Sequence, residues 1–141
     1  MKRKFFTNKV FRIMGSYNIM LVDDEKLLIQ CIELVLSIEG HEVNTATSAE
    51  EAFEKIKEIY SEGNKIDLLI TDIWMPGLSG LDLIKKLHKQ KIHPLIIGIS
   101  GFTDDKTLSE LYKKGCNDLV LKPFTSEELL ERIHLLMEKE E

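Results

Sequence analysis

The sequence has 141 residues, 43% of them hydrophobic and 30% charged, which excludes a fibrous or globally disordered chain and fits one ordinary domain. It contains no apolar run long enough to cross a bilayer. The net charge is −5, but residues 1–16 carry five positive charges and no acidic residue, so the remainder sums to −10. Such an acidic body repels a phosphate backbone, which disfavours nucleic-acid binding by the domain itself.

The amino-terminal segment differs in character from the rest. Residues 1–16 are basic with interrupted apolar residues, and we expect a poorly ordered extension; a membrane-surface helix or a partner-binding arm fits the same composition. The segment lacks a continuous signal-peptide core. Cys31 and Cys116 lack the spacing of a zinc or redox site. We therefore expect a cytoplasmic protein whose domain covers residues 17–139, without a membrane span.

From residue 17 onward, strand patterns alternate with helix patterns. In chain order the predicted elements are strand 17–22, helix 26–38, strand 42–46, a helix opened by Ser48 and ended by Gly63-Asn64, strand 67–71, a helix around Leu83, Ile84 and Leu87, strand 95–99, helix 104–114, strand 118–121 and a last helix opened by Thr125. Ser48 with Glu51, and Thr125 with Glu128, have the spacing of capping boxes.

This alternation predicts the architecture. Crossovers between parallel strands are helical and right-handed, so five strands and five helices predict an α/β fold with a doubly wound five-stranded parallel sheet. Strand 67–71 is almost entirely apolar inside, as expected for a strand covered on both faces. The sequence leaves no room after residue 139 for a second domain, so we expect a single domain that acts alone.

Polar side chains stand at the predicted carboxyl ends of the strands, where open α/β sheets bind ligands. These residues are Asp23 and Asp24 after the first strand, Asp72 after the third, Ser100 after the fourth and Lys122 after the fifth. Each carboxylate alone is more often a helix cap or dipole partner. Three carboxylates at one edge would repel one another without a cation among them, and the sequence supplies only Lys122.

A hard divalent cation such as Mg²⁺ would complete the charge balance, because three carboxylates, one Mg²⁺ and Lys122 sum to zero. Asp72 is then the candidate nucleophile, forming an acyl phosphate while the metal and Lys122 neutralise the transferred oxygens. Ser100 is placed to donate a hydrogen bond to one of those oxygens. The residues therefore predict a phosphoryl-accepting site.

The set of residues resembles the receiver domains of two-component response regulators, which are CheY-like and have a flavodoxin-like (βα)5 fold. The resemblance covers about residues 17–139. It is carried by Asp23-Asp24, Asp72 followed by Met75-Pro76-Gly77 and Gly80, Ser100-Gly101, and Lys122-Pro123-Phe124.

The resemblance implies a phosphorelay switch rather than an enzyme, phosphorylated on Asp72 by a histidine kinase or a histidine phosphotransfer protein. It implies a cis bond before Pro123 that aims Lys122 at the site. It also implies that Ser100 moves toward the phosphoryl group and shifts the face of the fourth helix, fifth strand and fifth helix, which binds a downstream protein. No DNA-binding domain is expected. The implied Mg²⁺ ligands are Asp23, Asp24, Asp72 and the Trp74 carbonyl.

Two residues depart from the family pattern. Leu119 stands where the family usually has Tyr or Phe, so rotation of an aromatic ring is excluded as the signal. Trp74, two residues after the acceptor, is bulky and borders the expected phosphoryl position, which predicts restricted access for water and slow loss of phosphate.

Three other interpretations fit parts of this pattern. A haloacid dehalogenase-type phosphatase would have a second Asp where this chain has Trp74. A flavin-binding module would need a hydroxyl-rich phosphate loop where Asp23-Asp24-Glu25 stands. A receiver without the chemistry, or a piece of a hybrid kinase, is weakened by the presence of every acceptor-site residue. Contact signalling and onward phosphoryl transfer both remain open.

Overall fold

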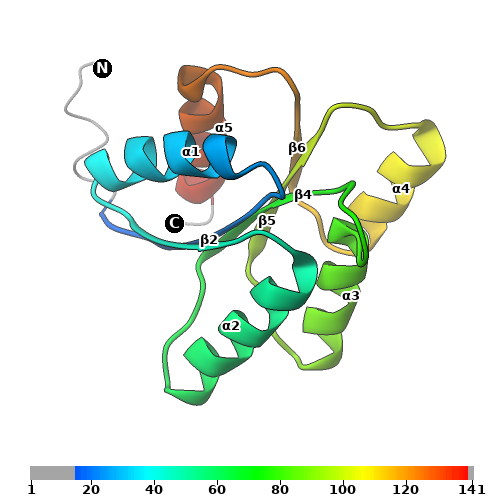
Figure 1. Ribbon diagram of the computed structural model, residues 1–141, viewed down its shortest axis with the longest axis horizontal. Coiled ribbons are helices and arrows are strands. Elements are labelled where there is room, and N and C mark those ends of the chain that lie inside the picture. The colour runs from blue at the N-terminus through cyan, green and yellow to red at the C-terminus, as the bar shows by residue number, and fades with distance from the viewer. Residues whose placement is uncertain (1–14, 140–141) are drawn as a thin grey trace.

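The computed structural model describes residues 15–139 (Figure 1). The predicted basic extension therefore lies outside the described residues, except for its last two. The elements are β2 (Asn18–Val22), α1 (Lys26–Ile38), β3 (Glu42–Ala46), α2 (Ala49–Ser61), β4 (Leu68–Asp72), α3 (Gly80–Lys89), β5 (Leu95–Ser100), α4 (Asp105–Lys113), β6 (Asp118–Leu121) and α5 (Ser126–Lys139).

The five strands form one parallel sheet in the order β3-β2-β4-β5-β6. The chain passes to one side of β2 to form β3 and then crosses back to form β4, so strand order reverses between β2 and β4. Helices α1 and α5 cover one face of the sheet, and α2, α3 and α4 cover the other (Figure 1). The predicted doubly wound fold is confirmed, and its switch point lies beside the predicted acceptor strand.

The sheet separates two apolar clusters because alternate strand residues point to opposite faces. On the α1 and α5 side, the cluster includes Ile19, Leu21, Leu36, Ile70 and Ile133. On the other side it includes Met20, Leu69, Phe53, Ile84 and Leu87. Residues 68–72 of β4 are all buried, as predicted for a central strand covered on both faces. The core thus fixes the strands whose ends carry the polar residues.

Most predicted boundaries agree with the structure, and α1, β3 and β6 match it residue for residue. Strand β4 begins and ends one residue later than predicted, although the Asp67 amide still donates to the Asn18 carbonyl at 2.8 Å. Strand β5 extends one residue further, to Ser100. Differences of this size arise at element ends, where the hydrogen-bond pattern fades.

The structure forms one of the two predicted capping boxes in full and the other in part. The Thr125–Glu128 capping box is confirmed, with both reciprocal hydrogen bonds present. The Ser48 hydroxyl accepts from the Glu51 amide as predicted, but Glu51 Oε1 accepts from the Thr47 amide and hydroxyl, at 2.8 and 3.2 Å, instead of the Ser48 amide. The reciprocal half of that box was therefore wrong, because the Glu51 carboxylate bonds to the amide and hydroxyl of Thr47 instead.

No helix within residues 15–139 combines the length and apolar character that a membrane crossing requires.

The start of α3 packs directly against the end of β4. A Cβ atom on Gly80 would lie 2.4 Å from the carbonyl oxygen of Asp72 and 3.0 Å from the Cα of Ile73. Both neighbours are backbone atoms, which cannot swing aside as a flexible side chain would. The Gly80 amide also donates to the Ile73 carbonyl at 2.9 Å. Gly80 thus lets α3 approach the acceptor strand closely.

We expect Gly80→Ala to lower the free energy of unfolding by about 1–3 kcal/mol, because the added methyl group must displace backbone. Urea denaturation measures this change. Gly101→Ala is the matched control, since a Cβ atom there meets nothing within 4 Å. Equal stability of the two variants would contradict the proposed close packing.

Candidate functional site

The carboxyl ends of β2, β4 and β6 bring four charged residues to one edge of the sheet. Asp23 and Asp24 follow β2, Asp72 is the last residue of β4, and Lys122 follows β6. One carboxylate oxygen from each aspartate lies within 4.8 Å of the others. Asp23 is completely buried and Asp72 is 5% exposed, whereas Asp24 is exposed. The predicted convergence of the three carboxylates is therefore present in the structure.

Lys122 is the cation at the centre of this cluster. Its Nζ atom lies 3.0 Å from Asp23 Oδ2, 3.1 Å from Asp72 Oδ2 and 3.1 Å from Glu25 Oε1. Sequence reasoning missed Glu25 as a member of the site. The sequence feature that could have identified Glu25 is its place as the third acidic residue in the run before α1. In the structure its side chain makes no capping hydrogen bond to the helix.

Burial and pairing act in opposite directions on these groups. Burial raises the pKa of Asp23, and the hydrogen bond from the Glu25 amide and the contact with Lys122 only partly offset it. Burial alone would lower the pKa of Lys122, but its three carboxylate partners outweigh burial and raise that pKa above its ordinary value. Lys122 therefore stays charged at neutral pH, whereas burial makes the ionised form of Asp23 less favourable than it is in water.

The surroundings of Asp23 show what kind of ligand the cluster fits. Asp23 Oδ1 accepts from the Glu25 amide at 2.8 Å. Asp23 Oδ2 is buried and has no hydrogen-bond partner, because Lys122 is close enough for an ion pair but lies outside hydrogen-bond geometry. A buried carboxylate oxygen without a donor is costly. A divalent cation that prefers oxygen ligands, such as Mg²⁺, would satisfy it, so the three aspartates fit a metal site.

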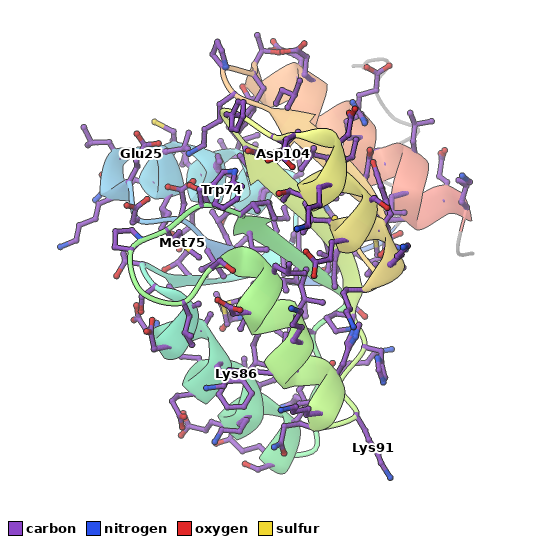
Figure 2. The ribbon with its side chains drawn as sticks, turned by 90° about the vertical axis from the view of Figure 1, so that its right-hand side faces the viewer. Glu25, Trp74, Met75, Lys86, Lys91 and Asp104 are labelled. Carbon is purple, nitrogen blue, oxygen red and sulfur yellow. The ribbon has the colours of Figure 1, made fainter. Side chains whose placement is uncertain are left out.

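Asp72 opens into a cavity of about 640 Å³, whose lining includes Asp24, Glu25, Trp74, Gly101, Phe102 and Lys122. The Asp72 carboxylate is held at both oxygens, since Oδ1 accepts from the Trp74 amide at 3.1 Å and Oδ2 accepts from Lys122. Figure 2 shows Trp74 between Glu25, at the start of α1, and Asp104, at the start of α4. The amide of Trp74 thus orients Asp72; a metal-binding role for the Trp74 carbonyl stays a prediction.

Ser100 is fully buried and is not among the residues that line this cavity. Its hydroxyl donates to the Phe102 carbonyl and accepts from the Phe102 amide at 3.1 Å. The same carbonyl accepts from the Trp74 indole Nε1 at 2.7 Å. These bonds hold the Ser100 hydroxyl at Phe102, and the Phe102 carbonyl ties the loops after β4 and β5 together.

The family of response regulator receiver domains matches residues 19–134. This chain belongs to that family. Response regulator SaeR of Staphylococcus aureus is 31% identical to it over 120 residues, which are 85% of this chain and 50% of SaeR. The chain thus spans about half the length of the curated relatives it matches.

Solved structures confirm the receiver fold. A CheY-like receiver domain from Methanospirillum hungatei has a TM-score of 0.79 and 26% identity, with 89% of this chain and 96% of that chain covered. A receiver domain from Clostridium thermocellum has a TM-score of 0.74 and 31% identity, with coverage of 89% and 96%. The CheX–CheY–BeF3–Mg complex from Borrelia burgdorferi matches with a TM-score of 0.77 and 25% identity, with coverage of 85% and 88%.

Two features of this receiver domain concern the residues beside the site. The peptide bond between Lys122 and Pro123 is cis, as predicted. Leu119, which replaces the usual aromatic residue, is half-buried and packs against the cluster under α2 and α3, and a Cβ atom on Gly98 would lie 3.1 Å from its Cδ1. Leu119 is therefore a packing residue.

We expect Lys122→Gln to lower the free energy of unfolding by about 1–3 kcal/mol in metal-free buffer at neutral pH, because three carboxylates lose their shared cation. Urea denaturation in a chelator provides the measurement. Lys65→Gln is the control: Lys65 also pairs with a carboxylate, Asp67, but its side chain is 76% exposed. That variant should stay within about 0.5 kcal/mol of wild type. A loss from Lys122→Gln as small as this would show that Lys122 does not hold the cluster together.

Proposed function

We propose that Asp72 accepts a phosphoryl group from a histidine kinase or a histidine phosphotransfer protein, in a reaction that requires Mg²⁺. The observation that carries the proposal is the Asp72 carboxylate, which opens into the cavity beside Lys122 and two further aspartates. The resemblance of Asp72, followed by Met75-Pro76-Gly77, to the acceptor motif of the family also supports the proposal.

The reaction forms a bond between an Asp72 carboxylate oxygen and phosphorus and breaks the bond from phosphorus to the donor. The Trp74 amide and Lys122 hold the carboxylate in one orientation, which prepares it for in-line attack. Lys122 carries a fixed positive charge toward the transferred oxygens. Bound at Asp23, Asp24, Asp72 and the Trp74 carbonyl, Mg²⁺ would neutralise charge on the phosphoryl oxygens.

The related protein from Borrelia burgdorferi supports the choice of metal and group, because its structure contains both BeF3 and Mg. Asp23 Oδ2 is buried and lacks a hydrogen bond, although it lies 3.0 Å from Lys122 Nζ, and this supports a cation from the chain's own geometry. The same geometry disfavours a flavin phosphate, which the carboxylates around the cavity would repel. Trp74 in place of a second aspartate, together with the family match, disfavours a phosphatase.

Signalling follows from a movement of Ser100 toward phosphorylated Asp72, which shifts the α4–β6–α5 face and changes its binding to a downstream protein. That face already presents apolar side chains to solvent, since Tyr112 of α4 is 47% exposed and Leu121 of β6 is 57% exposed. The receiver is thus a switch rather than a classical enzyme. Its action without a DNA-binding domain, its cytoplasmic location and its slow loss of phosphate stay predictions.

Incubation with acetyl phosphate and Mg²⁺ tests the acceptor directly. We expect the intact mass of the wild-type protein to increase by one phosphoryl group, and Asp72→Asn to show no increase because the nucleophilic oxygen is gone. Asp105→Asn, which removes an exposed carboxylate from α4, should behave like wild type. An equal mass gain in Asp72→Asn would place the modification elsewhere, and no gain in wild type would indicate a receiver without the chemistry.

Addition of Mg²⁺ alone should change the emission of Trp74, the only tryptophan, and raise the thermal midpoint of unfolding. A cation at one hundred times its dissociation constant stabilises the folded state by about 2.7 kcal/mol. Asp23→Asn should weaken both responses, since it removes a buried ligand charge. Asp67→Asn, at the opposite end of β4, should retain them. Responses that survive Asp23→Asn unchanged would remove Asp23 from the metal site.

A further inference from the structure

One backbone carbonyl joins the two loops that border the acceptor cavity. The Phe102 carbonyl, in the loop between β5 and α4, accepts hydrogen bonds from both the Ser100 hydroxyl and the Trp74 indole. Trp74 belongs to the loop between β4 and α3, 28 residues earlier. The indole therefore crosses from the acceptor loop to the loop that holds Ser100. We call this three-residue arrangement the Phe102 clasp.

The chemistry of a hydroxyl makes the clasp and the signalling movement mutually exclusive. A serine hydroxyl has a single proton to donate. While Ser100 donates to the Phe102 carbonyl, it cannot donate to a phosphoryl oxygen on Asp72. Ser100 also accepts from the Phe102 amide at 3.1 Å, so both of its bonds keep it in the resting turn. Its movement requires the turn to open.

Trp74 stabilises that resting turn from outside. Its amide donates to Asp72 Oδ1 at 3.1 Å while its indole donates to the Phe102 carbonyl at 2.7 Å. The indole bond fixes the carbonyl in the position where Ser100 can also reach it. Trp74 is 48% exposed, so packing in the core does not account for the placement of its side chain.

We propose that Trp74 is a positioning residue whose indole hydrogen bond holds Ser100 in the resting turn and so opposes the activated state. The inference rests on the proposed function, because it concerns the movement of Ser100 toward an occupied Asp72. A single hydrogen bond shifts such an equilibrium by a factor of roughly 2 to 10. Loss of the indole donor should therefore favour the activated state by that factor.

Beryllofluoride, which has the shape and charge of a phosphoryl group, is the probe for the first test. Its affinity for the protein in Mg²⁺ is measured by fluorine NMR for wild type and for Trp74→Phe, which keeps an aromatic ring but has no indole donor. We expect Trp74→Phe to bind roughly 2- to 10-fold more tightly. Unchanged or weaker binding would overturn the inference.

The same titration in a Ser100→Ala background shows whether Trp74 acts through Ser100. There the hydroxyl is absent, so adding Trp74→Phe should leave the affinity nearly unchanged. An equal gain in both backgrounds would show that Trp74 acts by some other route. Tyr60→Phe is a matched control, because it also removes a hydrogen-bond donor from an aromatic side chain. The lost bond runs from the Tyr60 hydroxyl in α2 to the Ile66 carbonyl, which precedes β4. That variant should bind like wild type.

A second measurement needs no substitution. The wild-type protein has one tryptophan and hence one indole N–H signal in its NMR spectrum. In the resting protein we expect this proton to exchange with solvent slowly, although the side chain is half exposed. Beryllofluoride and Mg²⁺ should speed its exchange as the clasp opens, and unchanged exchange in the bound protein would contradict the inference.

If wild type fails to bind beryllofluoride at all, the proposed function falls and the clasp falls with it; normal binding with no effect of Trp74→Phe overturns the clasp alone.

Discussion

The dominant constraint on the site is the electrostatic repulsion among carboxylates that the sheet brings close together. The parallel strands end at one edge, so Asp23, Asp24 and Asp72 meet within 4.8 Å, and only Lys122 contacts this group as a cation in the described part of the chain. Glu25 adds a further negative charge to the same lysine. The fold tolerates this arrangement because two apolar clusters fix the strands from both faces. An excess of negative charge held in a rigid frame is what makes the edge attractive to a divalent cation.

The pattern of the sequence was sufficient for the fold and for the residues at the strand ends. Alternating strand and helix periods determine which segments can pair, and the topology then places every strand end at one edge, so the approach of Asp72 to Lys122 follows without knowledge of side-chain positions. The same logic could not reach interactions that depend on side-chain rotamers. Glu51 bonds to Thr47 rather than Ser48, and Glu25 reaches Lys122, and the residue types and their spacing do not specify either partner.

The Phe102 clasp could not be predicted from the sequence. Trp74 was recognised as unusual, and Ser100 as a candidate hydrogen-bond donor, but their common partner is a backbone carbonyl, which every residue possesses. No residue type marks such a partner in advance. The site therefore has a buried part and an exposed part. Asp23 and Asp72 are buried at the ends of strands, whereas Trp74 and Phe102 are exposed in loops. Loops of this kind can rearrange while the sheet stays unchanged.

The position of Lys122 makes the charge balance of the site depend on the last strand of the sheet. Lys122 follows β6, which pairs with β5 at the edge of the sheet, and its carboxylate partners come from β2 and β4, up to 99 residues earlier in the sequence. A nascent chain still on the ribosome, or a fragment cut before β6 by a protease, would have the aspartates without the lysine. The charge balance of this edge therefore requires a sheet that is complete through its last strand, β6, and is not a property of the aspartates alone.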